Sequence, residues 1–442
     1  MAHLALITPP LVGHLNALQS LGRVLVSRGH RVTLLGPEDV RAWVWPDIGF
    51  APIGLETHPP GHVERQAQRM GRLFGPLGMR SMLRGLADDT AMVAREAPAV
   101  LERLGVDALV VDQLEPAGGV VARGLGVPYM SVACALPIER DEDVPPVFVG
   151  WRYDPSSHGR WRNAGGHLVA DRLMRRQHEA LAAAATRFGL EPRPLPSDWI
   201  SPTLSVSQTL PSLDFPRHAE PATMHHVGPL RVEDTREFPF ERDGRPLVFA
   251  SLGTLQGARK RLFRAIAFAA EKAGMQLVMV HCGRLTRSQV AALPGVGTRG
   301  GPIVTDFVPQ AHVLAQADLA VLHGGFNTVL DALATRTPMV VMPLAFEQPA
   351  IAARLERAGV AQRVSPWGTG WGGGRHHNLL TAMERVLNDT SMPGRLEAMA
   401  NEMRAADGAR RAADLAEAHL LDLRVEQDNV TPFPTAPRRG AA

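Results

Sequence analysis

Residues 319–342 read LAVLHGGFNTVLDALATRTPMVVM, and this stretch decides the fold. Its apolar runs at 319–322 and 339–342 have the length and continuity of strands buried on both faces of a parallel sheet. A glycine pair follows the first run, and the residues from Phe326 onward predict a helix that leads to the second run. Strand, glycine turn, helix and strand in this order predict a βαβ unit.

The same alternation of short apolar runs and helical patterns extends through the whole chain. The other candidate strands are 4–7, 32–35, 108–111 and 129–132 in the first half, and 247–250, 277–280 and 303–304 in the second. Because 442 residues are too many for one ordinary core, each half is expected to form its own parallel sheet. The predicted fold class is α/β, with two facing doubly wound Rossmann-like domains and a cleft between them.

A polar segment separates the two halves. RVEDTREFPFERDGR (231–245) is charged and contains proline, as is typical of a domain linker. We therefore expect an N-terminal domain at 1–230, a C-terminal domain at 246–425 and a loose tail at 426–442. The last predicted helix, 405–423, could pack back on the N-terminal domain.

Composition excludes several classes of protein. A net charge of +3, with no RNA- or DNA-binding signature, argues against a nucleic-acid partner. The two cysteines, Cys134 and Cys282, lie far apart and predict free thiols in a reducing cytoplasm. A secretory signal is not expected, and no uncharged apolar run reaches about 18 residues. The expected location is therefore cytoplasmic, without a membrane-spanning helix.

The first strand–helix junction carries a histidine in an informative place. TPPLVGHLN (8–16) follows the apolar run 4–7 and puts His14 on the first turn of a helix, at the edge where parallel sheets bind ligands. Asp112 ends the run 108–111 and faces the same crevice. The alternatives are a helix-capping or exposed histidine, and a capping or salt-bridged acid.

Two turns in the second half predict an anion site. His323 ends a strand, Gly325 lets the backbone approach a ligand closely, and Asn327 and Thr328 open a helix whose free N–H groups attract phosphate. A second turn, Ser251-Leu252-Gly253-Thr254, also follows a strand. The alternative for His323 is a histidine that closes its strand and nothing more.

From FVPQ (307–310) onward, the second half resembles the donor-binding signature of UDP-dependent glycosyltransferases of the GT-B fold. The resemblance implies that the FVPQ segment positions uracil and ribose, that HGGFNT (323–328) holds the diphosphate, and that Asp331 binds ribose hydroxyls. It also implies that the Glu347-Gln348 pair recognises the sugar. The chain departs from the plant signature by Phe for Trp, Asp for Glu and Glu for Asp. The implied donor-binding residues are Ser251, Gly253, Thr254, Phe307, Val308, Gln310, His323, Gly325, Phe326, Asn327, Thr328, Asp331, Glu347 and Gln348.

Other segments narrow the resemblance to carotenoid-glycosylating bacterial members of this family. They are THPPG (57–61), VVDQLEPAG (110–118), SVACALPIERDEDVP (131–145), LDFP (213–216), VGPLR (227–231), FASLGTLQG (249–257) and PLAFEQPAIAARL (343–355). The implied activity is inverting transfer of glucose from UDP-glucose to the terminal hydroxyls of zeaxanthin-like carotenoids, giving a mono- and then a di-β-glucoside. Macrolide, flavonoid or sterol acceptors, a UDP-sugar epimerase and an inactive UDP-sugar-binding module are the alternatives.

By the same resemblance, His14 is the general base and Asp112 the carboxylate that orients it. An acceptor alcohol is a poor nucleophile at neutral pH, and a largely neutral imidazole can remove its proton. This scheme needs no metal and no cofactor besides the donor substrate. Asp141-Glu142-Asp143 contains a D-x-D pattern, but its proline-rich surroundings predict a solvated loop.

The acceptor region is expected in loops of the first half. Residues 57–86 mix apolar side chains with five arginines, and a second such cluster surrounds Trp161. One interpretation is core packing with a solvated basic face. The other is an acceptor channel on a domain that docks reversibly on the inner membrane surface, because a carotenoid diol is almost insoluble in water.

Overall fold

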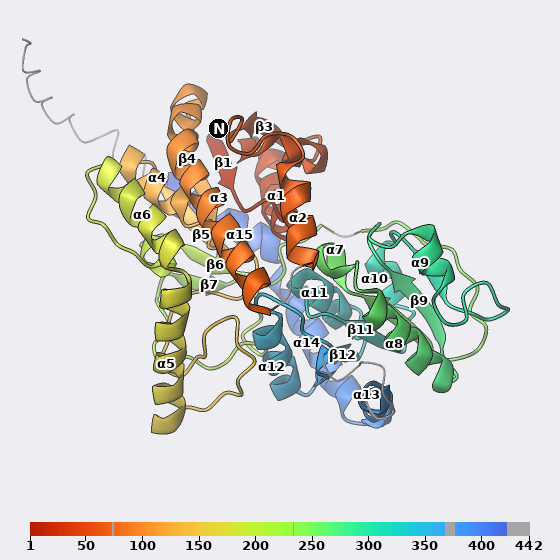
Figure 1. Ribbon diagram of the computed structural model, residues 1–442. Helices are drawn as coiled ribbons and strands as arrows, with labels where there is room; N and C mark the ends of the chain where they lie inside the picture. The colour runs from red at the N-terminus through yellow and green to blue at the C-terminus, as the bar shows by residue number, and fades with distance from the viewer. Residues whose placement is uncertain (73–74, 233, 367–375, 422–442) are drawn as a thin grey trace, which may run out of the picture.

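The computed structural model describes residues 1–72, 75–232, 234–366 and 376–421, and side chains at 70–76, 367–377 and 421 are outside the description. The tail expected at 426–442 lies outside the described residues. The described part forms two α/β halves, one built on each of two parallel sheets (Figure 1). In this part, no helix has the length and apolarity needed to cross a membrane.

The first sheet has the strand order β3-β2-β1-β4-β5-β6-β7. Its strands are β1 (His3–Ile7), β2 (Arg31–Gly36), β3 (Gly49–Pro52), β4 (Ala108–Asp112), β5 (Tyr129–Ala133), β6 (Ser205–Ser207) and β7 (Met224–His226). The helices of this half are α1 (Val12–Ser27), α2 (His62–Arg72), α3 (Gly75–Leu104), α4 (Ala117–Leu125), α5 (Ser157–Leu173) and α6 (Arg175–Arg187), with 3-10 turns at Glu38–Trp43 and Pro196–Trp199.

The second sheet has the order β10-β9-β8-β11-β12-β13. Its strands are β8 (Leu247–Ser251), β9 (Gln276–Val280), β10 (Ile303–Thr305), β11 (Leu319–Leu322), β12 (Met339–Val341) and β13 (Ala361–Arg363). The helices that follow along the chain are α7 (Gly253–Gln256), α8 (Lys260–Lys272), α9 (Arg287–Ala291), α10 (Gln310–Leu314), α11 (Phe326–Ala334), α12 (Gln348–Ala358), α13 (His376–Asn388), α14 (Met392–Ala406), α15 (Gly408–Ala416) and a π-turn at Glu417–Leu421.

The central strands are buried on both faces, as their continuous apolar runs predict. Along β1, Leu4 and Leu6 join a core with α1, whereas Ala5 and Ile7 join a core with α3, α4 and α6. The strand order reverses beside β1 and again beside β8, so two switch points exist. Ligands of open α/β sheets bind at the carboxyl ends of strands at such points. The predicted doubly wound architecture is confirmed.

Four strands have sequences without the apolar run by which the other strands are predicted. β3, β6, β7 and β13 have three or four residues each and lie toward the sheet edges. β6, for example, is Ser-Val-Ser: its backbone pairs with β5, the Ser205 hydroxyl accepts from Gln113 and donates to Glu139, and no apolar run marks the strand.

The predicted continuous helix at 405–423 is wrong at its start. Asp407 adopts a left-handed conformation with φ 44°, which ends α14 and lets α15 begin at Gly408. The turn redirects the chain so that Ala412 and Ala416 of α15 pack against α1 of the first half. Ion pairs from Arg28 to Glu417 at 2.6 Å and to Asp414 at 2.7 Å hold the same contact.

Candidate active site

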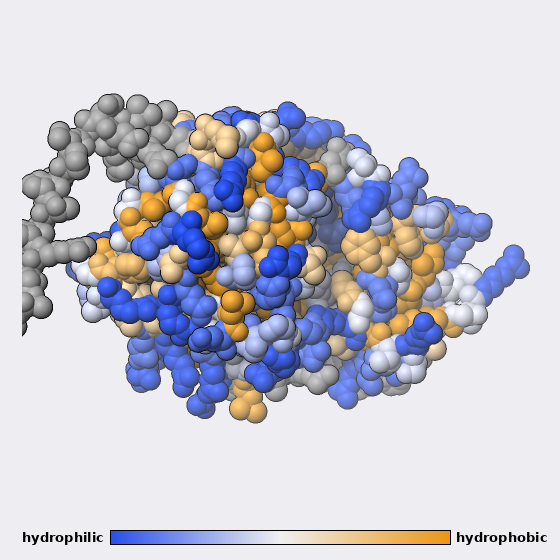
Figure 2. Space-filling model, turned by 90° about the horizontal axis from the view of Figure 1, so that it is seen from above, coloured by the Kyte–Doolittle hydropathy of each residue, from blue (hydrophilic) through white to orange (hydrophobic). Residues whose placement is uncertain are grey.

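A cavity of about 1220 Å³ lies between the two halves. Its walls come from the carboxyl ends of β4 and β5 with the start of α1 on one side, and from the ends of β8 and β11 with the start of α12 on the other. Seen from above, the surface is hollowed where the two halves meet (Figure 2). All the predicted catalytic and donor-binding residues except Asp112 line this cavity.

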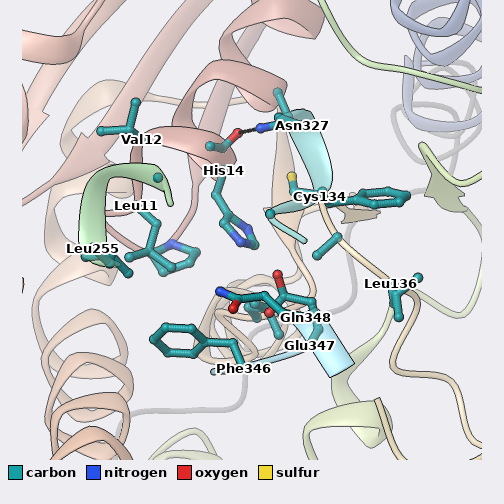
Figure 3. A pocket seen from close by; sticks show the side chains of 18 of the residues that line it. Leu11, Val12, His14, Cys134, Leu136, Leu255, Asn327, Phe346, Glu347 and Gln348 are labelled. Atoms are coloured by element: carbon teal, nitrogen blue, oxygen red, sulfur yellow. Dashed lines mark hydrogen bonds between the residues drawn. The ribbon is translucent and has the colours of Figure 1, made fainter. Parts of the chain in front are cut away.

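The structure brings His14 and Asp112 together. Nδ1 of His14 lies 2.7 Å from Oδ2 of Asp112, which is completely buried behind it. Thr8 Oγ1 donates to the same oxygen at 2.9 Å, and the backbone N–H of Leu114 donates to the other at 3.0 Å. Because Nδ1 faces the carboxylate, Nε2 is on the free side of the ring. The ring points into the cavity, toward Glu347 and Gln348 (Figure 3).

Electrostatics make His14 more basic than an ordinary histidine. Burial alone would lower its pKa, but the charge and hydrogen bond of Asp112, with a smaller contribution from Glu347, outweigh burial and raise the pKa. Burial would likewise raise the pKa of Asp112, and the His14 charge and hydrogen bond, with Leu114 and Thr8, keep it below its usual value. The pair therefore holds an ionised carboxylate beside an imidazole that accepts a proton readily.

Cys134 lies beside this pair, which the sequence analysis did not anticipate. Its thiol and the ring and carboxylate atoms of His14 and Asp112 lie within 4.8 Å of one another, a spacing that could hold a metal ion. Burial, with Asp112 nearby, raises the pKa of the thiol well above its ordinary value. In the absence of a metal the thiol is therefore protonated and can donate a hydrogen bond to the Asp112 carboxylate.

His323 directly follows β11 on the other side of the cavity, where its surroundings differ from those of His14. A Cβ at Gly253 or Gly325 would lie 2.6 Å or 2.5 Å from its ring, so both turns need glycine to let the ring fit. Burial lowers the pKa of His323 to about 4, against a weaker raising effect of the Ser251 backbone. The imidazole is therefore neutral at pH 7 and faces the start of α11, where free N–H groups favour an anion.

Asn327 connects the two halves. Its Nδ2 donates to the backbone oxygen of Gly13 at 2.8 Å, one residue before His14 (Figure 3). Gln208 Nε2 donates to its Oδ1 at 3.2 Å. The side chain expected on the diphosphate thus bridges the N-terminal turn and the donor side, while Thr328 stays beside Gln310 with Oγ1 3.4 Å from Oε1.

The end of the cavity predicted to hold the nucleoside, here called the nucleoside end, lies around Phe307, whose ring is exposed. Gln310 Nε2 donates to Asp331 Oδ2 at 2.6 Å, so two residues predicted to bind ribose form one unit. Val308 and Phe326 line the cavity, but their side chains pack into the core of the second half and leave mainly backbone for a ligand.

The end of the cavity predicted to hold the sugar is formed where α12 begins. Gln348 Oε1 accepts hydrogen bonds from the backbone N–H groups of Leu344 at 2.8 Å and Ala345 at 2.9 Å, so this side chain shapes the preceding loop. Phe346 has φ 55°, a conformation that is costly for a non-glycine residue and turns the loop toward the cavity. Glu347 is half-buried, and loss of hydration raises its pKa, whereas a backbone hydrogen bond and the charge of His14 partly offset this rise.

Two arginines of the linker reach the nucleoside end, and the sequence analysis missed both. Arg231 forms an ion pair with Asp331, and the Arg236 guanidinium lies 5.2 Å from the centre of the Phe307 ring. The only signal was that Arg231 ends VGPLR (227–231) and that Arg236 follows five residues later, in a segment whose linker pattern predicts solvated charges rather than contacts.

The prediction of a solvated loop at the D-x-D pattern is wrong. Asp141 and Asp143 are buried. Asp141 accepts from the backbone N–H groups of Asp143 and Ala219, both at 2.9 Å, and Asp143 accepts from Arg160 Nε at 2.7 Å. These carboxylates therefore hold the loop together instead of facing water.

The first half supplies an apolar extension of the cavity beyond His14. Its lining is mostly aliphatic or aromatic and includes Met79, Met82, Leu83, Leu86, Leu136, Pro137, Ile138, Pro146, Phe148 and Leu173. Such a lining suits a large apolar ligand.

Comparisons with known proteins agree with this geometry. Residues 94–399 match the UDP-glucoronosyl and UDP-glucosyl transferase family. The chain is similar to the zeaxanthin glucosyltransferase of Pantoea ananas, with 41% identity over 94% of this chain and 96% of that protein. It is also similar to the zeaxanthin glucosyltransferase of Pseudescherichia vulneris, with 37% identity over 94% of this chain and 98% of that protein.

Solved structures show the same fold. The kitacinnamycin glycotransferase aligns with a TM-score of 0.73 at 23% identity, covering 95% of this chain and 99% of the other. The calicheamicin glycosyltransferase CalG4 aligns with a TM-score of 0.71 at 21% identity, covering 96% and 99%. The predicted GT-B fold and family are confirmed.

Proposed function

The chain belongs to the UDP-glucoronosyl and UDP-glucosyl transferase family, and from this premise we propose that it transfers glucose from UDP-glucose to a terminal hydroxyl of a zeaxanthin-like carotenoid. The observation that carries the proposal is the His14–Asp112 pair, which faces the donor turns across a cavity with an apolar extension. The identity to the two zeaxanthin glucosyltransferases, 41% and 37%, supports the acceptor class.

In the proposed reaction, Nε2 of His14 takes the proton of the acceptor hydroxyl as its oxygen attacks the anomeric carbon of glucose. The bond from that carbon to the diphosphate oxygen breaks as the new bond forms on the opposite face, so the configuration inverts. Asp112 orients the imidazole and stabilises its positive charge. The departing UDP carries the developing negative charge toward the start of α11 and neutral His323.

We assign the donor to the half that spans 246–425 and the acceptor to 1–230, with 231–245 between them. Phe307, Gln310 and Asp331 would hold the nucleoside, and the α11 and Ser251–Thr254 turns the diphosphate. Glu347 and Gln348 would meet the glucose hydroxyls. For a symmetric diol, a second round at the other hydroxyl converts the monoglucoside to the diglucoside.

Product analysis tests this function directly. The protein is incubated with UDP-glucose and zeaxanthin in detergent micelles, and products are identified by mass. We expect additions of one and then two hexoses, and none with the His14→Ala variant. Glucosylation of a macrolide, flavonoid or sterol but not of the carotenoid would refute the acceptor. UDP-sugar isomerisation without transfer would refute the reaction.

We further propose that helix α5 docks the enzyme on the inner, cytoplasmic surface of an anionic membrane. In Figure 1, α5 projects from the first half at the lower left. Its outward side is apolar, with Trp161 at 75%, Leu168 at 71% and Val169 at 61% exposure. The arginines near it are Arg152, Arg162, Arg172, Arg175 and Arg176. Exposed apolar side chains framed by arginine suit an anionic lipid surface.

The same face adjoins the acceptor cavity. Phe148, Leu173 and Met79 are partly exposed and also line the cavity, so the mouth opens beside α5. An almost insoluble acceptor could pass from the bilayer into the cavity there. Flotation with phosphatidylglycerol vesicles should recover the protein, and Trp161→Glu/Leu168→Glu should abolish recovery. Leu387→Glu, at an exposed leucine on α13, is the matched control. Equal flotation of all three proteins would refute the docking face.

A further inference from the structure

The linker between the halves takes part in the nucleoside end of the cavity. Arg231, Asp234 and Arg236 all line it, beside Phe307 and Asp331. A linker whose only role is to connect domains would keep its charged side chains in water. Here two guanidinium groups lie on the two residues expected to contact base and ribose.

Arg231 and Gln310 hold the Asp331 carboxylate from two directions. Nη2 of Arg231 pairs with Oδ1, and Nε2 of Gln310 donates to Oδ2 at 2.6 Å. The Asp331 side chain is only 15% exposed, so this pairing happens largely out of water. Each carboxylate oxygen accepts more than one hydrogen bond, and both therefore keep capacity for a ligand hydroxyl.

The ion pair with Arg231 favours the ionised form of the Asp331 carboxylate. Burial raises the pKa of Asp331, and the charge of Arg231 is the largest influence that opposes it, followed by the Gln310 hydrogen bond; Asp234 adds to the rise. An ionised carboxylate is a stronger acceptor than a neutral carboxyl, which must also donate. Nη1 of Arg231 is buried and has no hydrogen-bond partner among the described residues, so Nη2 makes the contact through which the guanidinium acts on Asp331.

We propose that Arg231 is a positioning residue for the donor: it fixes Asp331 so that the carboxylate accepts the ribose 2′-hydroxyl of a uridine nucleotide. This inference rests on the proposed function, because it takes the donor to be a UDP-sugar. Arg231 acts through Asp331, and the binding energy it controls depends on the ribose 2′-hydroxyl. The linker is then part of the donor site, and the nucleotide is held by groups that precede the second half in the chain.

Calorimetric binding of UDP and of 2′-deoxy-UDP tests this role, because the two probes differ in one ribose hydroxyl. The wild type should bind UDP about tenfold more tightly than 2′-deoxy-UDP, the range expected for a hydrogen bond to a charged group. Arg231→Met should lower UDP affinity about tenfold and change 2′-deoxy-UDP affinity less than twofold, so that discrimination disappears. Arg231→Lys, which keeps a charge, should recover part of the discrimination.

Arg242 provides the matched control. It belongs to the same linker and pairs with a carboxylate in the same way, Nη2 lying 3.2 Å from Asp318 Oδ2, but it lies outside the cavity lining. Arg242→Met should therefore leave both affinities unchanged. Asp331→Asn should remove the discrimination by itself, and adding Arg231→Met to it should change the UDP to 2′-deoxy-UDP ratio no further.

The possible results distinguish a failure of this inference from a failure of the proposed function. A wild type that binds no UDP would refute the UDP-dependent function itself. Equal binding of both probes by the wild type would overturn the role of Asp331, and with it that of Arg231. If Arg231→Met weakened both probes equally, Arg231 would be a structural tie of the linker, and the proposal would fail. Retained discrimination in that variant would also overturn it.

Discussion

His14 and His323 face the same cavity from opposite halves, and their surroundings make them different chemical groups. Each is nearly buried where a strand meets a helix. His14 is 2.7 Å from a buried carboxylate, whose charge overcomes burial and raises the imidazole pKa. His323 lies against two glycine turns and has a pKa of about 4, because burial dominates. A carboxylate partner, rather than burial or fold position, separates a proton acceptor from a neutral donor.

Removing the imidazole on the first side should have the largest effect. His14→Ala deletes the proposed base, and we expect kcat to fall by about 10³-fold or more, within the range of general-base catalysis. UDP affinity should change little, because His14 contacts the acceptor side. Steady-state kinetics and UDP calorimetry measure the two quantities. Wild-type turnover in this variant would remove His14 from the mechanism.

Removing the Asp112 carboxylate tests whether its charge is what makes His14 differ from His323. Asp112→Asn keeps the shape but not the charge, and we expect kcat to fall about 10²-fold because the ring loses its preferred tautomer and the charge that stabilises its protonated form. The base must be unprotonated, so activity rises with pH through the pKa of His14. Since Asp112 raises that pKa, the acidic limb of the rate–pH profile should move to lower pH in the variant. An unmoved limb would show that another group titrates.

Removing the imidazole on the second side should affect the donor instead. His323→Ala should raise the KM for UDP-glucose about thirtyfold, in line with the loss of a hydrogen bond to a charged diphosphate. The fall in kcat should be much smaller than for His14→Ala. If His323→Ala lowered kcat alone and left donor KM unchanged, the assignment of the two histidines to separate tasks would be wrong.

The positions of Asp112 and His323 could be predicted from the sequence, because both residues lie at the ends of strands. Apolar runs fixed the positions of β4 and β11, and parallel topology then carried Asp112 and His323 to the sheet edges that face the cleft. The short edge strands could not be found in the same way, because strands such as β6 are held by side-chain hydrogen bonds rather than by an apolar pattern.

The site contacts that the sequence pattern does not predict join residues far apart in the chain. Arg231 meets Asp331 across 100 positions, and Asn327 meets Gly13 across 314. Neither contact follows from local spacing, since each depends on how the two halves sit together. For the same reason the local pattern predicts solvated acids at Asp141 and Asp143, whereas in the fold both are buried and accept hydrogen bonds from Arg160 and backbone N–H groups. Local patterns predict which edge a residue reaches, and tertiary packing decides its partner.

The smallest effect concerns stability, where the two histidines should respond to acid with opposite signs. His14 has a raised folded-state pKa, so its stabilisation is complete below the unfolded value of 6.5 and is lost as pH rises through the folded value. His323 has a folded-state pKa of about 4, so its stabilisation is present above 6.5 and is lost as pH falls toward 4. Between pH 7.5 and 5.5, the His323 contribution falls by about 1.4 kcal/mol.

Replacing His323 by a side chain that does not titrate should therefore make the protein less sensitive to acid. In His323→Gln, the loss of unfolding free energy between pH 7.5 and 5.5 should be smaller than in the wild type by about 1.4 kcal/mol, the proton-linked part of His323 alone. Urea unfolding at the two pH values gives this difference, and His312→Gln is the control, because His312 lies on α10 outside the cavity lining. An acid sensitivity equal to that of the wild type would mean that His323 has the same pKa in the folded and unfolded states, so that burial does not lower it.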